Sequence, residues 1–229
     1  MKIGGFQKMT LLDYPGKVAC TVFLSGCNLR CPFCHNALLV TKQEDTEISA
    51  EYIFNYLRKR QGILDGVCFT GGEPLLNNDI NLLMGEIKKL GYKIKVDTNG
   101  TRPEKLREVI EKGLVDYVAM DIKNCEEKYS ETTGVKLVDF TKIRESIDLL
   151  INGNIDYEFR TTVVDRYHTV EDIRRAAELI KGAKRYFLQG FVDSGELIGE
   201  GMGAVSKETM EEMKKAAEEF ISEVQIRGM

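Results

Sequence analysis

The sequence has no tryptophan, few prolines and no long hydrophobic run. Because a membrane-spanning helix needs about 20 consecutive apolar residues, we expect no membrane segment. The first residues, MKIGG, lack the apolar core of a secretory signal peptide. The formal net charge is −4, so bulk charge indicates neither a nucleic-acid nor a membrane surface. We therefore expect a cytoplasmic protein without a nucleic-acid partner.

A chain of 229 residues is long enough for one domain whose core needs no disulfide bonds. Its six cysteines are typical of a reduced, cytosolic protein of this size. Cys20, Cys68 and Cys125 lie in or near strand-like runs, and we expect them to pack rather than to react. No internal repeat is visible. We predict a single domain over residues 1–229.

The other three cysteines lie close together. Cys27, Cys31 and Cys34 have the spacing C-x3-C-x2-C and directly follow a strand-like run over 18–24. Thiolates select zinc, copper(I) or iron–sulfur clusters. Structural zinc and cubane clusters both usually take four protein ligands. Three cysteines without a nearby fourth therefore indicate a cluster with one iron left open. The alternative is a Cys3His zinc site with His35, although adjacent residues rarely reach the same metal.

Strand-like and helical patterns alternate along the chain. We predict strands over 18–24, 66–70, 93–97, 116–121, 156–163 and 185–190. We predict helices over 49–61, 78–90, 102–112, 139–152, 169–181 and 206–222. Such alternation gives right-handed βαβ units and a parallel sheet. Residues 1–17 form a lead-in, 18–222 form six βα units, and 223–229 form a short terminal strand. A closed eight-fold barrel needs two more units, so the pattern allows an open sheet or an incomplete barrel.

Polar or glycine-rich sequence marks each predicted strand. The cysteines follow the first strand. The second, third, fourth and sixth strands end in the segments 70–74, 97–100, 121–123 and 189–191, and the fifth strand contains Arg160. Ligands bind at the carboxyl ends of parallel strands. We therefore predict one binding site built from these segments.

The cysteine motif, with Phe33 before its last cysteine, resembles that of the radical S-adenosylmethionine (SAM) superfamily. The string CPFCHN at 31–36, with DYPGK at 13–17, resembles the glycyl-radical-enzyme activases. The match is strongest to the long form of the proteins that activate anaerobic ribonucleoside-triphosphate reductase. The resemblance covers nearly the whole chain. It implies an α/β fold with an incomplete (β/α)6 barrel of the radical SAM type.

The resemblance also implies a mechanism. Cys27, Cys31 and Cys34 would hold a 4Fe-4S cluster whose open iron binds SAM. Reductive cleavage of SAM would give methionine and a 5′-deoxyadenosyl radical, which takes a hydrogen from a glycine Cα of a partner enzyme.

Further site residues follow from the resemblance. Gly71, Gly72 and Glu73 match the GGE motif, in which we assign Gly72 to the SAM amino group and Glu73 to support of the loop. Lys123 and Arg160 match residues that contact the SAM carboxylate.

The pyruvate formate-lyase activator supplies three more assignments. By similarity to it, Asp97, Thr98 and Asp121 would help to bind a monovalent cation. Phe33 and His35 lie in the cysteine motif, and His35 would line the adenosyl pocket. Phe191 takes the place of a histidine that lies beside the adenine in that activator.

The implied partner is the large subunit of the anaerobic ribonucleotide reductase, with flavodoxin or ferredoxin as electron donor. Alternatives are an activase for another glycyl-radical enzyme such as pyruvate formate-lyase, a radical enzyme for a small metabolite, and a non-catalytic zinc or cluster module. The irregular stretches 124–138 and 193–205 are long for α/β connections. They are either surface loops or, as we hypothesise, help to admit a protein substrate. We expect His168, before a helix, at the surface.

Overall fold

The structure, a computed structural model, describes residues 1–41 and 48–228. It groups them into two compact units. Unit 1 comprises residues 1–28, 38–98 and 104–118, and unit 2 comprises residues 29–37, 99–103 and 119–229. Met229, the end of the predicted segment 223–229, lies outside the described residues. The single domain over residues 1–229 stays a prediction.

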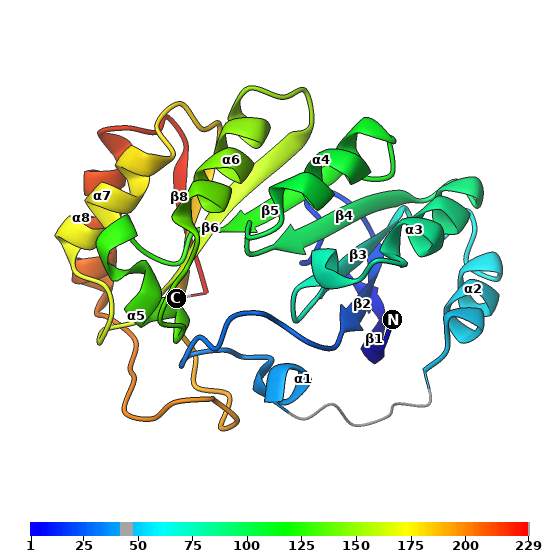
Figure 1. Cartoon of the computed structure of the whole chain (residues 1–229), viewed down its shortest axis with the longest axis horizontal. Helices are drawn as coiled ribbons and strands as arrows, with labels where there is room; N and C mark the ends of the chain where they lie inside the picture. The colour runs from blue at the N-terminus through cyan, green and yellow to red at the C-terminus, as the bar shows by residue number, and fades with distance from the viewer. Residues whose placement is uncertain (42–47, 229) are drawn as a thin grey trace. The chain divides into compact units, whose positions relative to one another are not determined.

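Unit 1 is built on parallel strands. β2 (Ala19–Leu24), β3 (Gly66–Gly71) and β4 (Lys93–Thr98) pair in chain order, and β1 (Ile3–Thr10) runs antiparallel to β2. The first two residues of β5 (Tyr117–Asp121) also belong to this unit. Its helices are α1 (Ala37–Thr41), α2 (Ala50–Arg58), α3 (Ile80–Lys89) and most of α4 (Pro103–Glu111), with a 3-10 helix, η1 (Pro74–Leu76). Figure 1 shows α3 alongside β4.

The helices of unit 1 form because their apolar residues recur at helical spacing. In α3, Ile80, Leu83, Met84 and Ile87 recur at this spacing and are buried. Gly91 follows the helix with a φ of +91°, a conformation that stops a helix and favours glycine. The sequence pattern therefore located both the buried face and the end of this helix.

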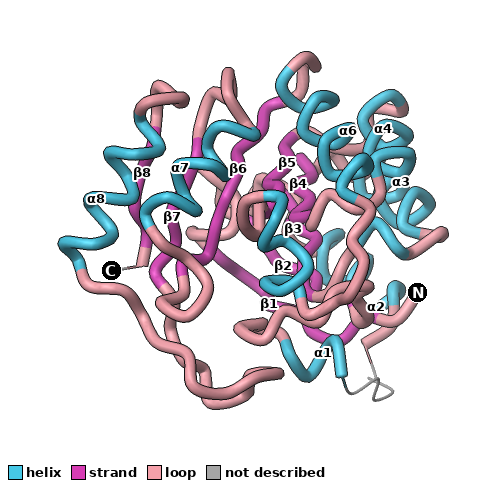
Figure 2. Tube along the Cα trace, turned by 60° about the vertical axis from the view of Figure 1, so that its left-hand side comes forward, coloured by secondary structure: helices cyan, strands magenta, loops and turns pink. Residues whose placement is uncertain are grey.

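Unit 2 continues the alternation with β6 (Asp156–Val163), β7 (Tyr186–Gly190) and β8 (Val224–Arg227), which pair in parallel in that order. Its helices are α5 (Tyr129–Thr133), α6 (Phe140–Ile151), α7 (Val170–Leu179) and α8 (Lys207–Glu218), with a 3-10 helix, η2 (Glu126–Lys128). Figure 2 shows α7 and α8 side by side near β8. Thr169 and Asp172 form a capping box at the start of α7.

All six predicted strands and all six predicted helices are present, with ends that shift by a few residues. Residues 3–10, within the predicted lead-in, form β1, a strand that the sequence pattern did not predict. Only the first and last residues of β1 are buried, so the strand has a weak hydrophobic pattern. The stretch 124–138 is also more regular than predicted, because it contains η2 and α5. None of the described helices is long and apolar enough to cross a membrane.

Candidate functional site

The three cysteines of the motif lie in a turn-rich segment and form no disulfide. Cys31 is buried, whereas Cys27 and Cys34 are partly exposed. The Cys34 amide donates to the Cys31 carbonyl at 3.1 Å, which makes a tight turn between these two residues. Within the described part of the chain, no three His, Cys, Asp or Glu side chains are gathered as a metal-ligand group. The fit of these residues to an iron–sulfur cluster rests on thiolate chemistry and on the spacing of the three cysteines.

The remaining three cysteines pack as predicted. Cys20, Cys68 and Cys125 are at most 1% exposed. Burial raises the pKa of the Cys20 thiol to about 12, which keeps it protonated and unreactive at neutral pH. The prediction that Cys20, Cys68 and Cys125 are packed in the interior is thus confirmed.

Backbone contacts within unit 2 hold the cysteine segment in place. The Arg30 amide donates to the Thr133 carbonyl at 2.9 Å, and the Gly199 amide donates to the Pro32 carbonyl at 2.9 Å. A Cβ on Gly134 would lie 2.2 Å from the Arg30 carbonyl oxygen, so this approach requires glycine. The two long stretches after β5 and β7 are therefore attached directly to the cysteine segment.

Three charged residues predicted to share a site meet in unit 2. Lys123 Nζ lies 2.9 Å from Asp121 Oδ2, and Arg160 Nη2 lies 3.0 Å from Asp121 Oδ1. Burial alone would raise the pKa of Asp121, but the charges of Lys123 and Arg160 outweigh it and lower this pKa to about 2. All three groups are charged at neutral pH, and together they carry a net charge of about +1. This group is chemically suited to a ligand carboxylate.

Two predicted aromatic residues also meet. The rings of His35 and Phe191 have centroids 5.7 Å apart at an angle of 48°. Phe191 is buried, whereas His35 is exposed. Tilted aromatic rings at this separation offer stacking surfaces to a flat heterocycle.

The Gly71–Gly72 pair in unit 1 is required by close backbone packing. A Cβ on Gly72 would lie 2.0 Å from the carbonyl oxygen of Gly26, and Gly71 has a φ of +108°. The Gly72 amide donates to the Leu24 carbonyl at 2.8 Å. These glycines let the loop after β3 pack against the segment that leads to Cys27.

Glu73 supports this loop from within. Its side chain is 1% exposed and accepts hydrogen bonds from the Leu75 amide at 3.1 Å and the Thr98 hydroxyl at 2.9 Å. The structure thus brings together Glu73 and Thr98, two residues that the sequence assigned to different tasks.

The predicted cation ligands already have partners inside the chain. Asp97 forms an ion pair with Lys95, whose side chain is 2% exposed. Thr98 donates its hydroxyl proton to Glu73, and Asp121 pairs with Lys123. Each of the two predicted carboxylate ligands thus has a cationic side chain beside it.

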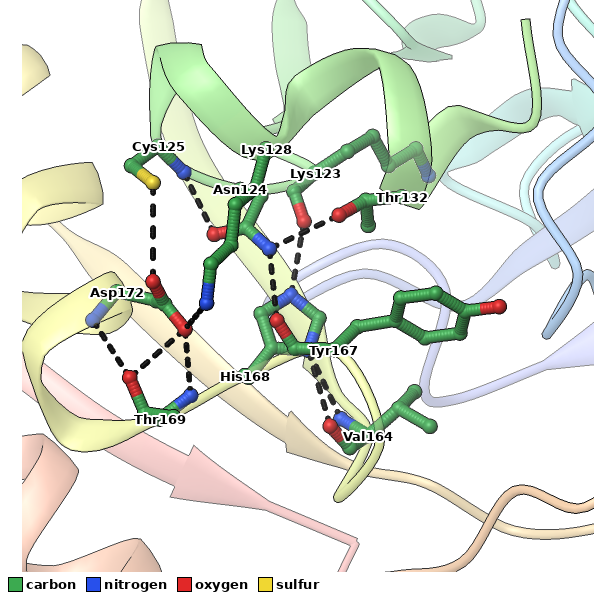
Figure 3. A network of polar contacts seen from close by, with 10 residues as sticks. All are labelled: Lys123, Asn124, Cys125, Lys128, Thr132, Val164, Tyr167, His168, Thr169 and Asp172. Atoms are coloured by element: carbon green, nitrogen blue, oxygen red, sulfur yellow. Dashed lines mark hydrogen bonds and ion pairs between the residues drawn. The ribbon is translucent and has the colours of Figure 1, made fainter.

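His168 is buried, so the prediction that it lies at the surface was wrong. Figure 3 shows its ring between two backbone segments. Its Nε2 lies 2.8 Å from the Lys123 carbonyl oxygen, and its Nδ1 accepts a hydrogen bond from the Val164 amide at 3.1 Å. Since Nδ1 accepts, Nε2 carries the proton of a neutral ring. The ring also contacts that of Phe33, with centroids 6.2 Å apart. Buried backbone groups that need partners draw this histidine inward.

Asn124 is a second residue that sequence reasoning missed. It is fully buried, and its Nδ2 donates to the Thr132 hydroxyl and to the Tyr167 carbonyl, both at 2.9 Å (Figure 3). Its Oδ1 accepts from the Cys125 amide at 2.7 Å. His168 and Asn124 together fix the backbone that carries Lys123. A buried asparagine directly after a predicted site lysine was the available sequence signal.

We expect the His168→Gln substitution to lower the free energy of unfolding. We also expect this free energy to depend less on pH than it does in the wild type. Burial lowers the pKa of His168, so the folded protein binds a proton less readily than the unfolded chain, whose histidine pKa is about 6.5. The free energy of unfolding should therefore fall as the pH drops below about 6.5. Loss of two buried hydrogen bonds should cost about 1–3 kcal/mol at pH 7. Urea denaturation between pH 7 and 5 measures both effects.

The matched control is His35→Gln, because His35 is the other histidine of the chain and is exposed. The His35→Gln protein should keep most of the pH dependence that the wild type shows in its free energy of unfolding. An unchanged pH dependence in His168→Gln would contradict the assignment of a buried, neutral ring.

A family model and the sequences of known proteins point to the same family for this chain. The model of the radical SAM superfamily matches residues 21–180. A putative glycyl-radical enzyme activating enzyme of Methanocaldococcus jannaschii is 33% identical, covering 98% of this chain and 95% of the relative. The pyruvate formate-lyase-activating enzyme of Clostridium pasteurianum is 30% identical, covering 80% of this chain and 77% of the relative.

Solved structures agree with the expected fold. Streptococcus suis SuiB bound to S-adenosylmethionine superimposes with a TM-score of 0.69 at 12% identity, over 91% of this chain and 52% of that chain. A domain of the pyruvate-formate lyase-activating enzyme from Bacteroides vulgatus gives a TM-score of 0.58 at 20% identity, over 71% of this chain and 99% of that domain. The predicted fold class, α/β with an incomplete (β/α)6 barrel, is confirmed.

Proposed function

Because this chain belongs to the radical SAM superfamily and to its glycyl-radical-enzyme activating enzymes, we propose that it generates a glycyl radical on an anaerobic ribonucleoside-triphosphate reductase. It is an enzyme whose cofactors are a 4Fe-4S cluster and SAM. The observation that carries the proposal is the group of Asp121, Lys123 and Arg160, in the same unit as Cys31 and Cys34. The strings CPFCHN and DYPGK favour the reductase as partner.

We assign Cys27, Cys31 and Cys34 as the cluster ligands. Their spacing leaves one iron without a cysteine, which is the position that a cofactor can occupy. When bound, the reduced cluster supplies the electron that cleaves SAM to methionine and a 5′-deoxyadenosyl radical. The attachments at Arg30 and Pro32 fix the backbone of this segment, so two of the thiols are held before any cofactor binds.

Lys123 and Arg160 are proposed to bind the carboxylate of SAM. Asp121 neutralises one of the two positive charges and leaves the other for the ligand. It also holds both side chains in fixed positions, which lowers the entropy lost on binding. Tyr129 supports this arrangement, because its hydroxyl accepts from the Lys123 amide at 3.4 Å.

The remaining predicted residues are proposed to orient the rest of the cofactor. His35 and Phe191 offer ring faces to the adenine, and an aromatic ring at position 191 preserves stacking without a histidine. Phe33 packs against Tyr167, with centroids 5.9 Å apart, and stiffens the turn between Cys31 and Cys34. The backbone at Gly72 remains the proposed site for the SAM amino group.

A glycyl-radical enzyme is proposed as the protein substrate. The stretches 124–138 and 193–205 are attached to the cysteine segment, and the second has exposed residues next to it, such as Val192. A partner that contacts these stretches would therefore lie near the chemistry. Reduced flavodoxin or ferredoxin is the proposed electron donor. The free thiols of the chain fit the reducing cytoplasm, where we place the enzyme.

The test is anaerobic electron paramagnetic resonance on the reconstituted, reduced protein with SAM and the large subunit of the anaerobic reductase from the same organism. We expect a glycyl-radical doublet on the reductase. The doublet should appear whether dithionite or reduced flavodoxin supplies the electron. If 5′-deoxyadenosine accumulates without a doublet, the chemistry stands and the partner is wrong. Pyruvate formate-lyase is then the next substrate to test, because its activating enzymes are among the relatives.

A further inference from the structure

The lysine at the middle of β4 lies inside unit 1. Lys95 and Asp97 are two residues apart on one strand, so their side chains emerge on the same face. The register of β3 and β4 places Cys68 opposite Lys95. Lys95 Nζ forms an ion pair with Asp97 and lies 3.8 Å from Cys68 Sγ. Backbone geometry therefore places these side chains on one face of the sheet, within reach of one another.

A buried lysine is costly for a protein to keep. The Lys95 side chain is 2% exposed, and its strand neighbours Ile94 and Val96 are fully buried apolar residues. Removing an ammonium from water costs several kcal/mol unless a close partner compensates. A hydrophobic residue would fill this position without that cost. The lysine is thus best explained by what it does for Asp97.

We propose that the Lys95 ammonium is the built-in counter-cation of Asp97, and that this enzyme consequently binds SAM without a free monovalent metal ion. The inference rests on the proposed function, because it concerns a carboxylate assigned to the SAM site. A lysine ammonium is a compact point charge. Covalent attachment places it beside the carboxylate at every salt concentration, whereas a free ion must be captured from solution.

The other carboxylate expected to bind a cation supports the inference. Asp121 is already neutralised by Lys123 and Arg160. Both expected carboxylate ligands thus have a cationic partner within the chain, and in the proposal the Asp97–Lys95 pair takes the place of the ion.

The experiment compares wild type with Lys95→Met in two salts, one with K⁺ and one with tetramethylammonium, which is too large to enter a small site. SAM binding to the cluster-loaded protein is measured by anaerobic equilibrium dialysis. Wild-type affinity should change less than about twofold between the salts, whereas Lys95→Met should bind about tenfold more weakly in tetramethylammonium and recover in K⁺. Independently of the cofactors, K⁺ should raise the melting temperature of apo Lys95→Met and not that of the wild type.

Two further variants locate the effect. Lys93→Met is the matched control, because Lys93 is on the same strand, is exposed and pairs with Asp116 at 2.9 Å. It should show no response to K⁺. The double variant Lys95→Met/Asp97→Asn removes both charges and should lose the response to K⁺ that Lys95→Met shows.

A wild type that needs K⁺ for SAM binding would overturn the inference, and this result does not depend on whether any variant folds. A folded Lys95→Met that binds SAM weakly in both salts would also overturn it. If the cluster-loaded wild type binds no SAM in either salt, the proposed function fails instead. These outcomes keep the two proposals distinguishable.

Discussion

Replacement of Cys31 by alanine should abolish both the iron–sulfur cluster and the cleavage of SAM. The change leaves two thiolates, which is too few to hold a cubane with one open iron. Because Cys31 is buried and alanine is smaller, the fold should survive the change. Iron and sulfide content, the visible absorption of the anaerobic protein and the yield of 5′-deoxyadenosine measure the effect.

Cys20→Ala is the matched control for this variant. Cys20 is fully buried, and its pKa is raised to about 12, so it should not ligate a metal. Cys20→Ala should keep the cluster and the brown colour of the protein, with a stability loss of about 1 kcal/mol from the small cavity. A Cys31→Ala protein that still cleaves SAM would refute the cluster assignment. A colourless wild type that binds zinc would favour a non-catalytic module.

The second large effect is expected from Gly72→Ala. A Cβ at this position would lie 2.0 Å from the Gly26 carbonyl oxygen, so the backbone of the loop must move. We expect a loss of about 2–3 kcal/mol in the free energy of unfolding, or about 5–10 °C in melting temperature for a protein of this size. SAM cleavage should fall at least tenfold, because the displaced loop packs against the segment before Cys27.

Gly85→Ala provides a control with the same chemical change. Gly85 lies in α3, and an added Cβ would meet only the Leu114 side chain, at 3.9 Å. Alanine is the better helix former, so this variant should gain up to about 1 kcal/mol. Calorimetry should show a lower melting temperature than that of the wild type for Gly72→Ala and a higher one for Gly85→Ala. Equal stability of Gly72→Ala and wild type would show that the loop does not need the close approach.

The secondary structure was largely predictable because each element has a strong local pattern. The helical stripe of α3 and the capping box of Thr169 and Asp172 are examples of such local signals. β1 was missed because only its two end residues are buried, and the six between them, which include two glycines, show no alternation of buried and exposed positions. The short helices η2 and α5 were missed because each is less than two turns long.

For the site, the residue types were predictable and the pairings were not. Asp121, Lys123 and Arg160 were predicted to face one site, and the structure joins them in one ion-paired group. His168 appeared to be a surface residue, since the sequence before a helix gives no sign of the carbonyl and amide that its ring must satisfy. The carbonyl belongs to Lys123, which lies 45 residues earlier in the chain.

The sequence by itself determined the class of chemistry, because the spacing of three cysteines and the alternation of strands and helices are properties of the local chain. Tertiary structure decided which charge lies beside which. Asp97 was predicted from the sequence to help bind a free cation, and the strand geometry places Lys95 on the same face, where the two side chains form an ion pair. The physical reason is that a buried charge must be neutralised where it lies, and the neutralising group is chosen by the packing of strands.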